Sequence, residues 1–282
     1  MISGSAFNIN AEISRQQALS QQIAQLQTDI STGIKVHVAS DDPAAAARIA
    51  AIRISQADNT VYSSNIDRAS ATASLVDTNL GSVQTSLDRA KELMLSASNG
   101  TLNASDRAAI VTELQGIQQD LQSYSQQTDS SGNPLYATDT PLAIPIDRTT
   151  SIAANESYDT VFGKVTMKDG STTSLNDMIS SAITAVTNND ATGMSTSLGN
   201  LDASQTQVTT ARADVGVRES RLTAASDRLA NAATDLTDER GGLEGTDVTA
   251  AYATLSQKMT TLSAAQTVLS QLSQTSLFQK LG

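Results

Sequence analysis

The sequence contains no cysteine, so it can form no disulfide, thiolate zinc site or cysteine nucleophile. Histidine occurs once, at His37, and a single imidazole excludes a His-rich metal site and disfavours a Ser-His-Asp triad. The segment Asp129–Asn133 (DSSGN) resembles part of a calcium loop but lacks the closing glutamate, so we expect a plain turn there. We therefore expect no metal site, no cofactor and no enzymatic activity.

Large side chains are also scarce. Tryptophan is absent and aromatic residues make up 3% of the chain, although 39% of the residues are hydrophobic. A thick globular core needs large side chains to reach native packing density, whereas alanine and leucine can fill the thin space between closely packed helices. This composition favours a narrow helical bundle.

An excess of basic charge is missing as well. The chain has 29 acidic and 18 basic residues, for a net charge of −11. Without a basic stripe to neutralise phosphates, we expect no nucleic-acid partner and no polybasic attachment to a membrane surface. No run of 18 apolar residues is long enough to span a bilayer, and the first residues lack the pattern of an ordinary secretory signal.

What the sequence does contain is two long series of small and apolar residues with a heptad period. One series steps by four and three residues from Tyr62 to Ala97, and the other recurs every seven residues from Leu201 to Leu243. A sustained 3.5-residue period indicates long helices that pack along one seam. The sequence therefore predicts a mainly α fold: an elongated antiparallel helical bundle or coiled-coil rod, with a small mixed α/β insert at its far end.

Turn and capping residues divide the chain into three predicted parts. These are the terminal helices (1–42 and 245–282), a long-helix rod (43–128 and 191–244) and an exposed insert (129–190). Within the rod, one helix is expected from Pro43 to about Ala97 and another over 194–243, with Gly241 and Gly242 interrupting its pattern.

Shorter elements are expected between the long helices. A return helix should begin at a cap formed by Asn103 or Ser105. In the insert, alternating residues over 158–167 predict a strand or hairpin, and a short helix is expected over 174–187.

The helices near the two ends are amphipathic, and an isolated helix of this kind is only marginally stable. Each needs a partner, and the available partners are the other terminal helix and the same helices of neighbouring copies. The residues predicted to form this assembly interface are Ile13, Ile23, Leu26, Ile30, Leu255, Met259, Leu262, Leu269, Leu272, Leu277 and Phe278.

A strong helix start is predicted at Ser40, Asp41, Asp42 and Pro43. Serine or aspartate can cap the first turn, and proline is favoured at the first helical position. The two aspartates could instead be read as a carboxylate pair for acid–base chemistry. Their place directly before proline favours capping.

The same region carries a family resemblance. Ile30–Val36 (ISTGIKV) and Ala39–Ala46 (ASDDPAAA) are similar to the S-T-G-x-x-V and S-D-D-P-A signature of the bacterial flagellin family. Three further segments resemble hook-associated members of that family: Ser96–Arg107, Asp129–Tyr136 and Thr275–Leu281. The resemblance covers about 1–136 and 205–282.

The resemblance implies a structural subunit that assembles with copies of itself into a helical tube. Terminal helices would form the inner tube, the long helices the next layer, and the insert would face outward. It also implies type III export to the extracellular flagellum, an export chaperone, and other axial proteins (hook-associated proteins and flagellin) as partners. A short filament flagellin and a secreted coiled-coil adaptor remain as alternatives.

Overall fold

The computed structural model describes the backbone of residues 2–153, 155–167 and 170–281, and within these ranges the side chains of residues 10–271. The residues fall into two compact units. The terminal unit combines residues 1–56 with 233–282, and the central unit comprises residues 57–232. Helices α2 (Pro43–Ala97) and α5 (Ala191–Glu244) each contribute residues to both units.

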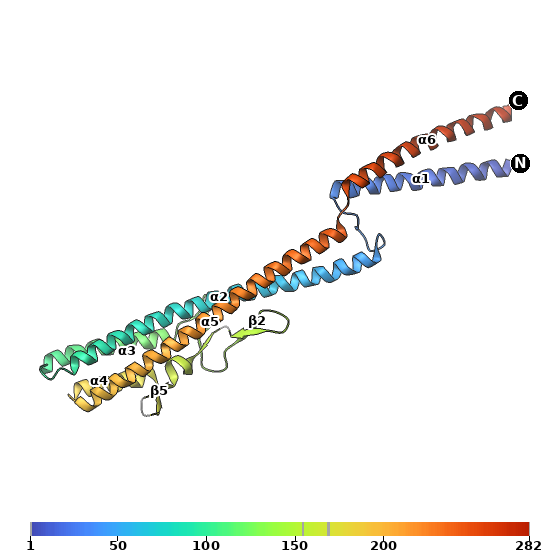
Figure 1. The fold of residues 1–282 in the computed structure, drawn as a ribbon. Helices are drawn as coiled ribbons and strands as arrows, with labels where there is room; N and C mark the ends of the chain where they lie inside the picture. The colour runs from blue at the N-terminus through green and yellow to red at the C-terminus, as the bar shows by residue number, and fades with distance from the viewer. Residues whose placement is uncertain (1, 154, 168–169, 282) are drawn as a thin grey trace. The chain divides into compact units, whose positions relative to one another are not determined.

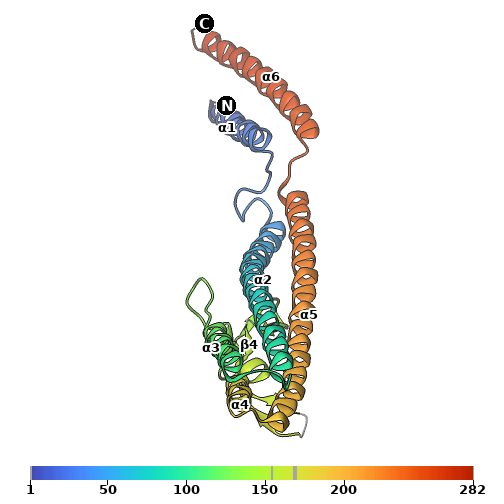
Figure 2. The ribbon, with the colours of Figure 1, turned by 90° about the vertical axis from the view of Figure 1, so that its left-hand side faces the viewer.

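The central unit is a helical bundle. Its parts of α2 and α5 run side by side in opposite directions, and α3 (Ala104–Ser125) and α4 (Leu175–Thr187) pack with them (Figures 1 and 2). The core residues of α2 and α5 are those of the two heptad series: Ala73, Val76, Leu80, Val83, Leu87, Leu201, Val208 and Val215, all no more than 1% exposed. The prediction of a mainly α antiparallel bundle is confirmed.

Further along α5, toward the terminal unit, the heptad residues belong to a second, smaller hydrophobic cluster. Leu222 is buried in a cluster with Ile66 and Ala69 of α2. Leu229 is only partly buried. The seam is therefore densely packed from the first turn of α5 to Ala225 and thins toward the end of the helix.

The helix ends follow the predicted capping chemistry. The Asn103 side chain accepts hydrogen bonds from the backbone N–H groups of Ser105 and Asp106, so Asn103 and not Ser105 caps α3. Ser174 caps α4 by accepting from the backbone N–H of Asp177. Helix α5 stays helical through Gly241 and Gly242 and ends at Glu244, one residue beyond the predicted end at 243.

The described residues of the insert form three small two-stranded sheets. In these, β1 (Tyr136–Ala137) is parallel to β4 (Glu156–Ser157), while β2 (Ala143–Pro145) with β3 (Ser151–Ala153) and β5 (Val165–Thr166) with β6 (Thr172–Thr173) are antiparallel. The expected strand or hairpin over 158–167 is largely wrong. Residues Asp159–Gly163 form a single π-helical turn, η1, which buries Val161 and Phe162 together.

Buried polar contacts attach the insert to the long helices. The Arg218 Nη2 of α5 donates to Glu156 Oε2 at 2.8 Å, and both side chains are less than 15% exposed. The Tyr136 hydroxyl donates to Asn79 Oδ1 of α2 at 2.6 Å. Burial, together with the negative charge of Glu156, raises the pKa of Tyr136, so the hydroxyl stays a donor over the physiological range.

The terminal unit holds α1 (Ile2–Thr32), α6 (Val248–Leu281), and the adjoining ends of α2 and α5. Helices α1 and α6 pack against one another and run in opposite directions (Figure 1). Gly33 ends α1 with a φ of +71°, a left-handed conformation that favours glycine.

Candidate assembly interface

Two chain passages link the terminal helix pair to α2 and α5. Residues 33–42 join α1 to α2, and residues 245–247 join α5 to α6. The passages are bridged to each other, because the Lys35 N–H donates to the Glu244 carbonyl at 2.7 Å and the Thr246 N–H donates to the Gly33 carbonyl at 2.9 Å. Ile34 and Gly245 form an antiparallel bridge between these bonds.

The residues of the predicted helix start have separate roles in the longer passage. Asp42 Oδ1 accepts from the N–H groups of Ala44 and Ala45 and caps α2, with Pro43 as its first residue. Asp41 instead holds the preceding turn, accepting from the backbone N–H groups of Val38 and His37. These hydrogen bonds lower the pKa of Asp41. Ser40 is exposed in the turn.

His37 contacts the end of α1. Its Nε2 lies 3.0 Å from Asp29 Oδ1, and Gln25 Nε2 donates to the same oxygen at 3.0 Å. Asp29 is 9% exposed, so it is one of the most enclosed side chains of the terminal unit. His37 thus holds the passage against α1. Of the two aspartates, Asp41 stabilises the turn and Asp42 caps α2.

Ion pairs join the first turns of α2 to the last turns of α5. Arg48 contacts both carboxylate oxygens of Glu239, at 2.6 and 2.9 Å, and Arg53 Nη2 lies 2.9 Å from Glu244 Oε1. The Arg48 guanidinium lowers the pKa of Glu239. Because Arg48 and Glu239 are both exposed, water and salt screen their attraction. These contacts orient the helix ends more than they stabilise them.

The predicted assembly residues of α1 and α6 are covered unevenly. Ile23 is buried, Leu26 and Ile30 are half-buried, and Ile13 is 39% exposed. In α6, Leu255, Leu262 and Leu269 are half-buried and Met259 is 51% exposed. Leu272, Leu277 and Phe278 belong to α6, but their side chains lie outside the described residues. The pair therefore leaves much of its apolar surface open.

An apolar ridge on α6 extends the predicted interface from Met259 to Val248 and Tyr252, which the prediction did not include. Val248, Tyr252 and Met259 are 47%, 65% and 51% exposed, and their spacing places them on one side of the helix. They lie beside the half-buried row of Leu255 and Leu262, which faces α1. The seven-residue step from Tyr252 to Met259 was available as a signal.

A shallow groove runs between α1 and α6. Its walls include Ile13 and Leu262 together with four glutamines: Gln16, Gln17, Gln21 and Gln266. The Nε2 of Gln16 is buried and has no hydrogen-bond partner. An unpaired buried donor costs about 1–3 kcal/mol. The groove is therefore neutral and amide-rich, with one unsatisfied donor.

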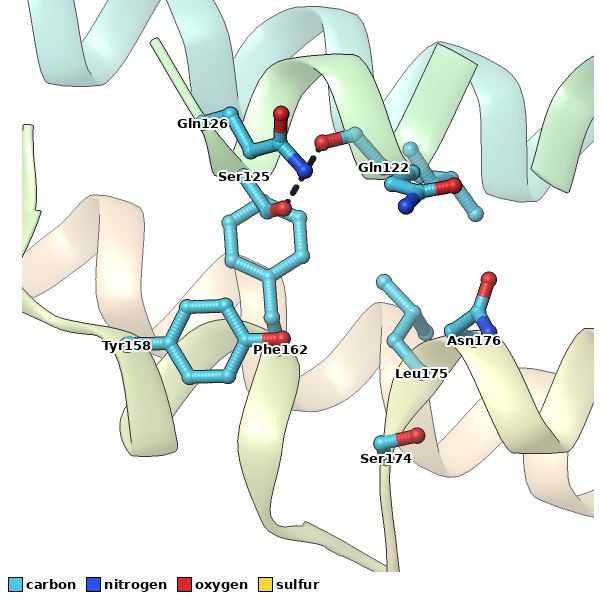
Figure 3. A pocket seen from close by; sticks show the side chains of 9 residues that line it. Gln122, Ser125, Gln126, Tyr158, Phe162, Ser174, Leu175 and Asn176 are labelled. Atoms are coloured by element: carbon cyan, nitrogen blue, oxygen red, sulfur yellow. Dashed lines mark hydrogen bonds between the residues drawn. The ribbon is translucent and has the colours of Figure 1, made fainter. Parts of the chain in front are cut away.

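The central unit has a separate cavity of about 220 Å³ at the meeting point of α3, η1 and the start of α4 (Figure 3). The rings of Tyr158 and Phe162 stack along one side with centroids 5.8 Å apart, and Gln122 and Gln126 lie across from them. None of its lining residues is a carboxylate, histidine or lysine. The arrangement offers no acid, base or nucleophile pair for catalysis.

Within the described ranges, no group of three or more His, Asp or Glu residues gathers as a possible metal site. Nor does any helix in the described part of the chain combine the length and hydropathy needed to cross a lipid bilayer.

Both the N-terminal and the C-terminal part of the chain match a known protein family. Residues 4–140 match the bacterial flagellin N-terminal helical region, and residues 198–281 match the bacterial flagellin C-terminal helical region. Flagellar hook-associated protein 3 of Escherichia coli (strain K12) is 27% identical over 285 residues, which cover 89% of this chain and 90% of that protein. The same-named protein of Salmonella typhimurium is 36% identical over 125 residues, 44% of this chain and 39% of that protein's length.

Solved structures share the fold at low identity. A flagellar hook-associated protein from Vibrio parahaemolyticus gives a TM-score of 0.64 at 18% identity, covering 73% of this chain and 100% of that one. The flagellar junction protein from Legionella pneumophila gives 0.56 at 16% identity, covering 72% and 100%.

Proposed function

Because the chain belongs to the bacterial flagellin family, we propose that it is a structural subunit of the bacterial flagellum and acts as its hook–filament junction protein. The two curated relatives named as hook-associated protein 3 support this assignment over a filament flagellin. We propose no catalytic role.

The observation that carries the proposal is the open apolar surface of the terminal pair. Ile13 and Met259 lie in the predicted interface yet remain more than a third exposed, and the Val248–Tyr252–Met259 ridge extends that surface. A helix pair with half-covered apolar rows gains stability when further helices cover them. Contact between different faces of successive copies, rather than a closed two-fold pair, generates a helical array.

The three predicted parts have distinct roles in this proposal. Residues 1–42 and 245–282 assemble the inner tube, residues 43–128 and 191–244 form the layer around it, and the insert 129–190 faces outward. The partners are further copies and the neighbouring axial proteins, namely other hook-associated proteins and flagellin. The subunit is exported to the extracellular flagellum, with an export chaperone as a transient partner.

A strain that lacks this gene tests the proposal. We expect electron microscopy to show hooks without filaments, and flagellin to appear in the medium. The full-length chain should restore filaments and swimming. Loss of the filament protein itself, with hook-associated proteins still in place, would favour the filament-flagellin alternative, and unchanged flagella would favour the adaptor.

Removal of residues 260–282 tests the assembly role of α6. The shortened chain should keep the helical signal of its central unit in circular dichroism and fail to enter flagella. A shortened chain that restores swimming would contradict the role given to the terminal helices.

A further inference from the structure

The groove between α1 and α6 carries an inference that rests on the proposed function and specifies its chemistry. We propose that Gln16 is a specificity-determining residue of assembly: its amide pairs with an amide or hydroxyl on a terminal helix of a second copy. The contact between copies is thus neutral and hydrogen-bonded as well as apolar.

The first observation is the unsatisfied donor. Gln16 Nε2 is enclosed between the helices without a hydrogen-bond partner, whereas nearby Gln22 and Gln25 are paired with Lys258 and Asp29. Buried donors in native proteins are nearly always satisfied, so an exception needs a physical account. Because Gln16 lines an open groove, rotation about its last side-chain torsions brings the amide to the groove surface.

The second observation is the near absence of available charge on both helices. Five charged residues occur in α1 and α6: Glu12, Arg15, Asp29, Lys258 and Lys280.

Those of the five with described side chains are already engaged. Glu12 pairs with Arg15 at 3.0 Å, Asp29 with His37, and Lys258 with Gln22. A strongly charged partner would thus be desolvated at this groove without compensation.

The third observation identifies the occupant. Helix α1 carries six glutamines and α6 carries five, and an amide side chain supplies both donors and an acceptor. A terminal helix of a second copy therefore offers what the groove lacks, namely an acceptor for Gln16 and apolar side chains for Ile13 and Leu262. Its own surface is equally poor in charge, so the two surfaces match.

The matched variants are Gln16→Met and Gln27→Met. Methionine keeps the length and flexibility of glutamine and removes its hydrogen-bonding groups. Gln27 is exposed on the same helix and does not line the groove, so it controls for the general effect of the substitution.

Each variant should be co-expressed at equal level with the tagged wild-type chain in a strain that lacks the native gene. The ratio of variant to wild type is measured by mass spectrometry in isolated flagella and in the secreted protein. We expect Gln16→Met to be secreted normally but to be about tenfold under-represented in flagella, since one net hydrogen bond of about 1.4 kcal/mol is worth a factor of ten. Gln27→Met should incorporate equally with wild type.

Thermal unfolding of the purified monomers separates assembly from folding. Gln16→Met should be at least as stable as wild type, because the monomer loses no hydrogen bond and no longer buries an unpaired donor. Equal incorporation of Gln16→Met, or a loss of incorporation that accompanies a lower melting temperature, would overturn the proposal while leaving the junction function in place. Failure of the wild-type chain to enter flagella would overturn both.

Discussion

Leu222→Ala is the sharpest test of the long-helix seam. Leu222 is 1% exposed and sits in a small cluster where α2, α5 and the β2–β3 hairpin meet, with Ile66, Ile144 and Ile152 around it. Truncating a buried leucine removes its transfer free energy and leaves a cavity, at about 2–5 kcal/mol. Because rigid helices and a hairpin surround the site, collapse into the space is limited, and we expect a loss of about 3 kcal/mol.

The assay is urea denaturation of the full chain followed by circular dichroism. With a slope of about 2 kcal/mol per molar urea, a loss of about 3 kcal/mol lowers the midpoint by about 1.5 M without changing the slope. In thermal unfolding it corresponds to a fall of about 6–12 °C for a unit of this size.

Leu229→Ala is the matched control. Leu229 follows one heptad later but is only partly buried, so its truncation should cost about 1 kcal/mol. Equal midpoints for the two variants would refute the uneven packing of the seam. An unchanged midpoint for Leu222→Ala would refute the pairing of α5 with α2 at this point.

Three further predictions address the buried ion pair, the insert loop and the chain ends. Arg218→Met should cost about 3–5 kcal/mol in urea denaturation because it leaves Glu156 charged and unpaired, and adding Glu156→Leu should recover part of that loss; a double variant worse than the single one would contradict this. Hydrogen bonds, above all from the backbone N–H of Thr149, lower the pKa of Asp147 to about 2. NMR titration of this carboxyl should therefore give a midpoint near 2 rather than near 3.8. The stabilisation that the carboxylate gives its loop is complete above the pKa of the unfolded chain and is lost as the pH falls through about 2. Limited proteolysis of the dilute monomer should remove residues about 1–40 and 245–282 first and leave a core near 45–240, and full protection of both ends would favour a stably folded adaptor.

The long helices could be predicted from the sequence because their signals are local and repeated. The heptad from Leu201 to Leu222 gave the buried row of α5, and Pro43, Asn103 and Gly33 marked helix ends through chemistry that needs no tertiary contact.

The sequence alone did not predict the structure where contacts between distant parts of the chain determine it. The alternating residues around Val161 and Phe162 form a π-turn in place of a strand. The unpaired amide of Gln16 depends on how α1 meets α6, which no local pattern encodes.

The bridged passages beside Gly33 and Gly245 have a mechanical consequence. A helix pair attached through one covalent strand could swivel freely about the single bonds of that strand. Here two strands leave together, and the hydrogen bonds of Lys35 to Glu244 and of Thr246 to Gly33 tie them to each other. Rotation of the terminal pair about its axis must stretch or break these bonds. The two hydrogen-bonded strands thus resist twisting. A part of a rotating organelle must transmit torsion from one end to the other, and this attachment is suited to do so.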